Sequence, residues 1–171
     1  MSQIFHPLPH IIATVDAFYR EKMDAAYVIG LQIRWGRGRD DIYFSDWEYD
    51  LNRFFECSLA VATNKHAKQV RSSVLFYIST DNDHVLTVAK QVLGNTRVIH
   101  QNIGERLYGV RAPDEDWEAP VIDNLILRKC DELVVTQGST FGYLAHATAD
   151  IIPYMIRRNP VFNLHHAEER N

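Results

Sequence analysis

The segment DELVVTQGSTFGYLAHA, residues 131–147, decides the fold. It begins as an apolar run typical of a buried strand, turns at Gly138, and continues with the apolar spacing of a helix. A strand that turns directly into a helix is the building unit of parallel α/β sheets. The unpaired N–H groups at such a helix start form a candidate anion site, and Ser139 or Thr140 can donate to a phosphate there. Ordinary helix capping by Ser139 or Thr140 explains the same residues equally well, so both interpretations stay open.

Strand-like and helix-like segments alternate along the rest of the chain. We expect strands at 25–35, 73–80, 96–102, 131–137 and 151–158, and helices at 8–22, 46–70, 81–94, 120–130 and 139–149. This alternation predicts an α/β fold with a doubly wound, mostly parallel sheet of about five strands. Pro153 predicts that the last strand is an edge strand or is interrupted.

The length of 171 residues predicts one domain over 1–171. We expect its core at about 25–157, an N-terminal helix within 1–24, and a loosely ordered tail at 158–171.

The composition narrows the class of protein. A net charge of −4 argues against a nucleic-acid binder, because phosphate-dominated binding requires a basic surface. The chain shows no signal peptide and no apolar window long enough to span a membrane, so we expect a soluble chain of unknown compartment. Cys57 and Cys130 lie in unrelated segments without metal-type spacing; we expect two buried thiols, and the sequence does not show whether they pair.

Ligands of open parallel sheets bind outside the carboxyl ends of the strands. The residues that follow the predicted strands, at 34–39, 80–83 and 137–142, are therefore candidate site residues, together with Asp123 on the helix before the fourth strand. Arg34 emerges at the same sheet edge as the 131–147 turn, and its guanidinium matches a phosphate with two parallel hydrogen bonds. The chain has neither a GxxxxGK[ST] loop nor a GxGxxG after its first strand, which argues against a P-loop and against an NAD site.

The acidic pair Asp81 and Asp83 admits two interpretations. A D-x-D pattern after a buried strand can hold Mg²⁺ or Mn²⁺ against a nucleotide diphosphate, since hard cations prefer carboxylate oxygens. Alternatively, Asp81 caps the following helix and Asp83 adds a second acid to its first turn. The eight histidines show no convincing metal-ligand spacing.

Three separated segments carry a resemblance to a known family. YVIGLQIRWG at 27–36, FYISTDNDHV at 76–85 and VIDNLILRKCDELVVTQGSTFGYLAHA at 121–147 resemble, in that order, the donor-binding half of the GDP-fucose fucosyltransferases. The last segment is most similar to the plant cell-wall, xyloglucan-type enzymes. The resemblance covers roughly 25–157 and implies a single Rossmann-like lobe of a GT-B fold.

The resemblance implies a set of residues that bind the donor GDP-fucose: Gln32, Arg34, Asp81, Asp123, Ser139, Thr140, Phe141 and Gly142. Arg34 would grip the diphosphate and act as the catalytic residue that stabilises the departing GDP. Asp81 would lie near the nucleotide, and Asp123 would read the guanine edge. Gln32 stands where relatives often have a histidine, so its role is less defined.

Ser139 and Thr140 match the donor-phosphate contacts of the family, and Phe141 and Gly142 complete the turn.

The family chemistry is an inverting transfer of fucose to a glycan or protein hydroxyl, with no cofactor and no metal. Two alternatives stay open: a non-catalytic GDP-sugar-binding lobe, and a metal-dependent transferase that uses Asp81 and Asp83. The acceptor lobe of the family is not recognisable here, so we expect a missing lobe or a homo-oligomer to complete the enzyme. Asp40 and Asp41 are general-base candidates by position only, and typical eukaryotic relatives work in the Golgi lumen.

Overall fold

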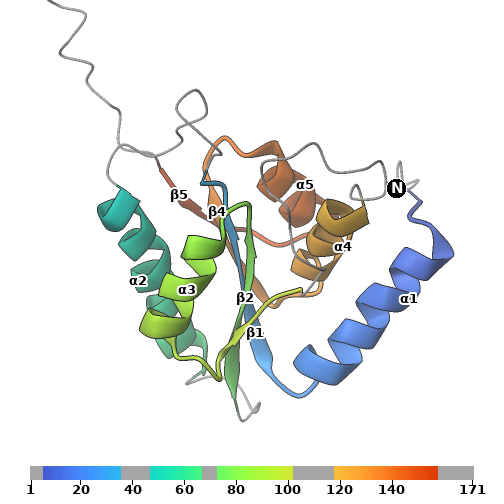
Figure 1. Cartoon of the computed structure of the whole chain (residues 1–171), viewed down its shortest axis with the longest axis horizontal. Helices are drawn as coiled ribbons and strands as arrows, with labels where there is room; N and C mark the ends of the chain where they lie inside the picture. The colour runs from blue at the N-terminus through green and yellow to red at the C-terminus, as the bar shows by residue number, and fades with distance from the viewer. Residues whose placement is uncertain (1–5, 36–46, 67–72, 102–117, 158–171) are drawn as a thin grey trace, which may run out of the picture.

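The computed structural model of the chain describes residues 6–35, 47–66, 73–101 and 118–157. These residues form five strands, five α-helices and one π-helical turn (Figure 1). In chain order they are α1 (Pro9–Phe18), the π-helix η1 (Tyr19–Met23), β1 (Tyr27–Ile33), α2 (Trp47–His66), β2 (Val74–Thr80), α3 (Asp83–Leu93), β3 (Val98–Ile99), α4 (Glu118–Leu127), β4 (Glu132–Thr136), α5 (Thr140–Ala149) and β5 (Tyr154–Ile156).

The strands form one sheet in the order β3-β2-β1-β4-β5, and all four pairings are parallel. The chain therefore proceeds from β1 outward through β2 to β3, then returns to the other side of β1 to add β4 and β5. This confirms the predicted doubly wound α/β fold. The order of strands reverses between β1 and β4, and such a switch point is where ligands of this architecture bind.

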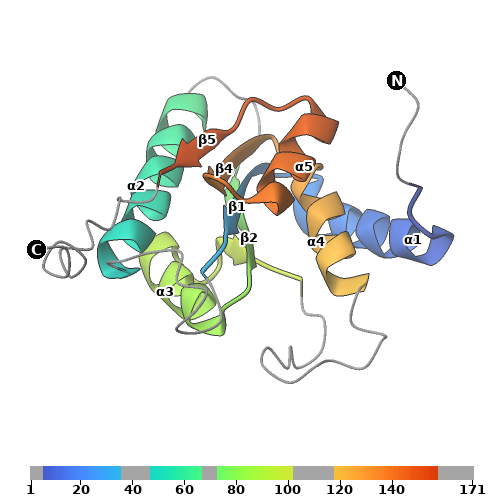
Figure 2. The ribbon, with the colours of Figure 1, turned by 90° about the horizontal axis from the view of Figure 1, so that it is seen from above.

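Helices cover both faces of the sheet, which explains why the central strands are apolar throughout. Helices α2 and α3 lie on one face, and α1, α4 and α5 lie on the other (Figures 1 and 2). Every residue of β1 is buried, because successive side chains enter two different cores. Tyr27, Ile29 and Leu31 pack among the α2 and α3 side chains, whereas Val28 packs among those of α1, α4 and α5.

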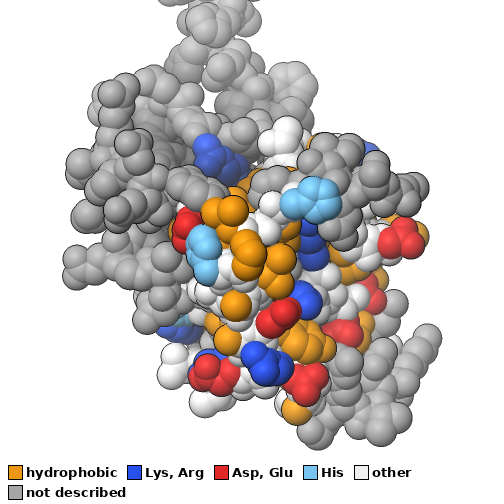
Figure 3. Space-filling model, turned by 90° about the vertical axis from the view of Figure 1, so that its right-hand side faces the viewer, with side chains coloured by type: hydrophobic (Ala, Val, Ile, Leu, Met, Phe, Trp, Pro, Cys, Tyr) orange, Lys and Arg blue, Asp and Glu red, His pale blue; other side chains and the backbone are white. Residues whose placement is uncertain are grey.

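The surface of α1 and α4 combines apolar side chains with charges of both signs (Figure 3). Two exposed contacts join these helices and their flanks: His10 Nε2 is hydrogen-bonded to Glu118 Oε1 at 2.9 Å, and Lys129 Nζ forms an ion pair with Asp16 Oδ1 at 3.0 Å. Exposed pairs of this kind contribute little stability, about 0–1 kcal/mol each.

Several element boundaries differ from the predictions. The predicted 8–22 helix ends as an α-helix at Phe18 and continues as the π-helical turn η1, and the third strand pairs over only Val98–Ile99. The last strand lies at the sheet edge and begins directly after Pro153, as predicted, because proline has no N–H to donate to a ladder. The predicted tail at 158–171 lies outside the described residues.

Capping of the third helix by Asp81 is a wrong prediction. Asn82 occupies the N-cap position of α3, and its side chain accepts the His84 N–H at 2.9 Å. Asp81 instead directs its carboxylate towards the end of β1, as described below. Asp83 does lie in the first turn of α3, as predicted.

Both cysteines are free thiols. Cys130 is buried as predicted, whereas Cys57 is only half-buried; burial raises the pKa of both thiols. Within the described part of the chain, no helix has both the length and the apolar character needed to cross a bilayer.

The close packing of β1 against β4 and against the end of α4 depends on Gly30. A Cβ atom on Gly30 would lie 2.7 Å from Leu133 Cδ2, 2.9 Å from Cys130 Sγ and 3.0 Å from Leu127 Cδ2. We therefore expect Gly30→Ala to lower the free energy of unfolding by about 1–3 kcal/mol through overpacking. Chemical denaturation measures this, with Ile152→Ala as the control, because Ile152 is 89% exposed. Equal stability of Gly30→Ala and the wild type would contradict the close packing.

Candidate functional site

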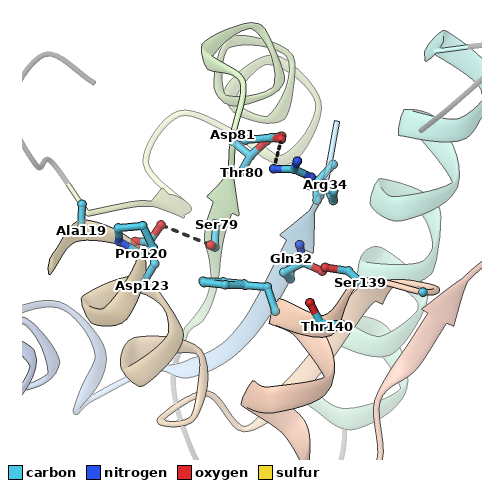
Figure 4. A pocket seen from close by; sticks show the side chains of 13 residues that line it. Gln32, Arg34, Ser79, Thr80, Asp81, Ala119, Pro120, Asp123, Ser139 and Thr140 are labelled. Carbon is cyan, nitrogen blue, oxygen red and sulfur yellow. Dashed lines mark hydrogen bonds and ion pairs between the residues drawn. The ribbon is translucent and has the colours of Figure 1, made fainter. Parts of the chain in front are cut away.

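A pocket of about 370 Å³ opens at the carboxyl ends of β1, β2 and β4, next to the start of α4 and the start of α5 (Figure 4). This is the switch point of the sheet. The residues that line the pocket come from four segments that are distant in sequence: Gln32, Ile33, Arg34, Ser79, Thr80, Asp81, Ala119, Pro120, Asp123, Gly138, Ser139, Thr140 and Phe141. Of the eight predicted site residues, the structure brings seven to the pocket wall, and Gly142 is not among the lining residues.

Arg34 and Asp81 form an ion pair at the mouth of the pocket. Arg34 Nη1 lies 2.8 Å from Asp81 Oδ2 (Figure 4). The other carboxylate oxygen, Oδ1, accepts the backbone N–H of Trp35 at 2.8 Å. Asp81 therefore holds both the backbone and the side chain of the segment that follows β1. A guanidinium has five N–H donors, so it can keep this ion pair and still contact an anion in the pocket.

Thr136, at the end of β4, fixes the end of β1 from the opposite side. Its buried hydroxyl donates to the Gln32 carbonyl at 3.1 Å and accepts the Arg34 N–H at 3.0 Å. The ladder between β1 and β4 ends at Gln32 and Val135, so this hydroxyl continues the pairing by one residue. Sequence reasoning missed Thr136, because nothing in a single strand shows what its last side chain faces.

Gln32 and Gly142 meet where α5 approaches β1. The Gln32 side chain is buried, and its Oε1 has no hydrogen-bond partner among the described residues. A Cβ atom on Gly142 would lie 2.8 Å from this Oε1 and 3.1 Å from Val135 Cβ. The glycine thus lets the first turn of α5 approach the two central strands.

The start of α5 is built differently from an ordinary capped helix. Ser139 occupies the N-cap position, but its side chain makes no capping hydrogen bond, so the predicted capping by this hydroxyl is wrong. The residue is buried in the pocket wall instead. Gly138 makes the turn with φ of 82°, a conformation that favours glycine, and its N–H donates to the Tyr143 hydroxyl at 2.8 Å. Because first-turn N–H groups have no intrahelical acceptor, this end of the pocket favours an anion.

Asp123 lies on the other side of the pocket, on α4 (Figure 4). The residue is only 4% exposed, and side chains of β2 donate to both of its carboxylate oxygens. The Tyr77 hydroxyl donates to Oδ1 at 2.6 Å, and the Ser79 hydroxyl donates to Oδ2 at 3.2 Å. Sequence reasoning found Asp123 but missed both of these donors.

Asn124, the next residue of α4, links this helix to α5. Its side-chain amide Nδ2 donates to the Phe141 carbonyl at 2.9 Å, while its Oδ1 accepts from Arg128 Nε at 3.0 Å and from Arg128 Nη2 at 2.8 Å. Two consecutive residues of α4 therefore have different roles. Asp123 lines the pocket, and Asn124 holds the first turn of α5 through the Phe141 carbonyl.

Asp83 is a predicted candidate that the structure does not bring to the pocket. Asp83 is exposed on the first turn of α3 and does not line the pocket, and Asp40 and Asp41 lie outside the described residues. Among the described residues, no three His, Cys, Asp or Glu side chains gather closely enough to hold a metal ion.

The reversed strand order and the pocket at its switch point define the class of this chain as a Rossmann-like α/β domain. No family model matches the chain. Over 84 residues it is 34% identical to Nodulation protein Z of Bradyrhizobium diazoefficiens, an alignment that covers 47% of this chain and 22% of that protein.

Solved structures with the same fold include two fucosyltransferases. The crystal structure of NodZ alpha-1,6-fucosyltransferase co-crystallised with GDP has a TM-score of 0.57 at 20% identity, and it covers 81% of this chain and 41% of that one. A mutant of Arabidopsis thaliana FUT1 in complex with GDP has a TM-score of 0.58 at 16% identity, and it covers 91% of this chain and 35% of that one. These findings confirm the predicted fold and the predicted resemblance to GDP-fucose fucosyltransferases. The chain spans less than half the length of these relatives.

The Thr136 hydroxyl provides a structural test of how the site is held. We expect Thr136→Val to lower the free energy of unfolding by about 1–2 kcal/mol, because it removes the acceptor of the Arg34 N–H in a buried place. Thr63→Val is the matched control, since the Thr63 hydroxyl donates to the Leu59 carbonyl on an exposed helix face. Denaturant titration of both variants measures the free energy of unfolding that each substitution removes. An equal loss of unfolding free energy in the two variants would contradict a role of the Thr136 hydroxyl in holding the end of β1.

Proposed function

We propose that this chain is the donor-binding lobe of a fucosyltransferase, which binds GDP-fucose and supports transfer of fucose to a glycan or protein hydroxyl. The observation that carries the proposal is the arrangement of the pocket at the switch point. Arg34 and the start of α5 flank one part of it, and the carboxylate of Asp123 lines another. The shared fold with two fucosyltransferases crystallised with GDP supports the same proposal.

The diphosphate is assigned to the part of the pocket near Arg34 and α5. Negative charge develops on the diphosphate as the bond to the sugar breaks, and a fixed guanidinium stabilises that charge. The first-turn N–H groups of α5 and the hydroxyls of Ser139 and Thr140 add donors on the same side. Asp81 keeps the Arg34 guanidinium in place through the 2.8 Å ion pair.

The guanine base is assigned to the part of the pocket near Asp123. A carboxylate accepts two hydrogen bonds side by side, and guanine offers two adjacent donors, its N1–H and its exocyclic amine. Adenine has no N1–H and uracil has only one ring N–H, so the same carboxylate disfavours both bases. Pro120 and Phe141 supply apolar lining beside it.

Transfer requires one bond to form and one to break. The acceptor hydroxyl oxygen attacks the anomeric carbon of fucose from the face opposite the diphosphate, and the bond between that carbon and the β-phosphate oxygen breaks with inversion. The electron pair leaves with GDP, and the hydroxyl proton passes to a general base, for which Asp40 and Asp41 remain the candidates. Acceptor binding is assigned to a further lobe or to a second copy of the chain.

The contacts of Asp81 favour a metal-independent mechanism over the alternative that uses Asp81 and Asp83. Asp81 forms an ion pair with Arg34, and the positive charge of this guanidinium opposes the binding of a cation by the same carboxylate. Asp83 lies outside the pocket lining. A lobe that binds the nucleotide without turnover is the second alternative, and it shares the same pocket.

Nucleotide selectivity tests the proposed donor. We expect GDP to raise the melting temperature by several degrees at about 100 times its Kd, which corresponds to roughly 2.7 kcal/mol, because the ligand binds only the folded state. UDP, ADP and NAD at the same concentration should have little effect. The same GDP shift in Mg²⁺ and in EDTA is expected from a metal-independent site. A shift that appears only with Mg²⁺ would support the metal-dependent alternative instead, and no response to GDP would refute the proposal.

Arg34 is the residue on which transfer should depend most. We expect Arg34→Ala to raise the Kd for GDP at least tenfold and to lower turnover of GDP-fucose by about 10²-fold or more, since leaving-group stabilisation is lost. Calorimetry and a fucose-transfer assay measure the two effects. Arg20→Ala is the matched control, because Arg20 is exposed on η1 and lies outside the pocket lining. A folded and fully active Arg34→Ala protein would rule out the assigned role. GDP binding without turnover by the wild type would support the non-catalytic alternative.

A further inference from the structure

The carboxylate of Asp123 is held by a pair of hydrogen bonds that cross from the sheet to α4. Tyr77 and Ser79, two residues apart on β2, direct their hydroxyls to the same face of the sheet and donate to one oxygen each. The 2.6 Å distance between the Tyr77 hydroxyl and Asp123 Oδ1 lies in the range of charge-assisted O–H···O⁻ bonds, which are stronger than neutral ones.

Tyr77 is itself rigidly placed. It is fully buried, and its backbone pairs with Gly30 of β1 on one side and Ile99 of β3 on the other. Its ring contacts the ring of Phe18 edge to face, with centroids 5.7 Å apart and planes at 75°. The sheet and α1 therefore fix the position of the Tyr77 hydroxyl. This hydroxyl in turn orients the Asp123 carboxylate.

Orientation matters because recognition by two parallel hydrogen bonds needs the carboxylate and the base edge in one plane. An aspartate side chain has two rotatable torsions, and two fixed donors remove that freedom before a ligand arrives. We propose that Tyr77, which does not line the pocket itself, is a positioning residue that sets the nucleobase selectivity of the site by holding Asp123 ready for two-point contact with the base. This inference rests on the proposed function and deepens it.

A purely structural role for Tyr77 makes a different prediction. If the hydroxyl only provides a hydrogen bond to a buried carboxylate, its removal lowers the stability of the protein and raises the Kd of every nucleotide by the same factor. If the hydroxyl orients the carboxylate, its removal raises the Kd of a base with two hydrogen-bond donors more than the Kd of a base with one. GDP and IDP provide this comparison, because inosine keeps the N1–H of guanosine and lacks the exocyclic amine.

The test is calorimetric binding of GDP and IDP to the wild type and to Tyr77→Phe, which keeps the ring packing against Phe18. We expect the wild type to prefer GDP about tenfold, the value of one good hydrogen bond. In Tyr77→Phe the Kd for GDP should rise about tenfold and that for IDP about threefold, so that the preference falls to about threefold. Ser79→Ala should lower the preference in the same direction, and it replaces Tyr77→Phe if that variant fails to fold.

Tyr27→Phe is the matched control. Tyr27 is also a buried strand tyrosine whose hydroxyl donates to a carboxylate, Glu132 Oε1 at 3.1 Å, but it lies at the start of β1, away from the pocket. We expect this variant to keep the wild-type preference for GDP over IDP.

Each outcome separates the inference from the proposal on which it rests. A wild type that prefers GDP, together with a Tyr77→Phe variant that keeps the same GDP-to-IDP ratio, overturns the role of Tyr77 and leaves the proposed donor intact. An equal loss of preference in Tyr27→Phe also overturns that role, because the effect would then be a general consequence of losing a buried hydrogen bond. A wild type that binds no guanine nucleotide refutes the proposed function itself.

Discussion

The parallel pairing of β1 with β2 on one side and β4 on the other is the constraint on which the rest of the structure depends. Because β1 lies in the middle of the sheet, the chain must cross to both faces, and helices cover both. The reversal of strand order next to β1 then leaves a crevice at the carboxyl ends that no crossover helix fills. Gly30 allows side chains of β4 and of the end of α4 to pack closely on this central strand, and Gly142 does the same for the first turn of α5.

The pocket is organised by contacts between protein groups before any ligand binds. Arg34 is fixed through Asp81 and Thr136, and Asp123 is fixed through Tyr77 and Ser79. Groups that are already oriented lose little conformational freedom on binding, and they need not reorganise when charge develops in a reaction. The arrangement has a cost, because buried polar groups must be satisfied, and among the described residues Gln32 Oε1 has no hydrogen-bond partner.

Most of the fold could be predicted, whereas individual contacts in the site could not. Strand and helix positions follow from the period of apolar residues, and the predicted alternation matches the observed order of elements. Helix capping, one of two interpretations of Asp81 and Ser139, is a local interpretation that the structure does not support: Asn82 caps α3, and Ser139 occupies the N-cap position of α5 without a side-chain capping hydrogen bond. Asp81 accepts from Trp35, 46 positions earlier in the chain, and such a partner leaves no mark in the local sequence.

The α/β class, the order of the elements and the short segments that end at the sheet edge follow from the sequence, because these depend on local periodicity and on turn residues. Only the tertiary structure decided which side chains of those segments meet. The Tyr77–Asp123 hydrogen bond joins residues 46 positions apart, and the Thr136–Arg34 hydrogen bond joins residues 102 apart. Their distances depend on strand register and on the approach of helices to glycines, which are properties of packing between elements and not of any one segment.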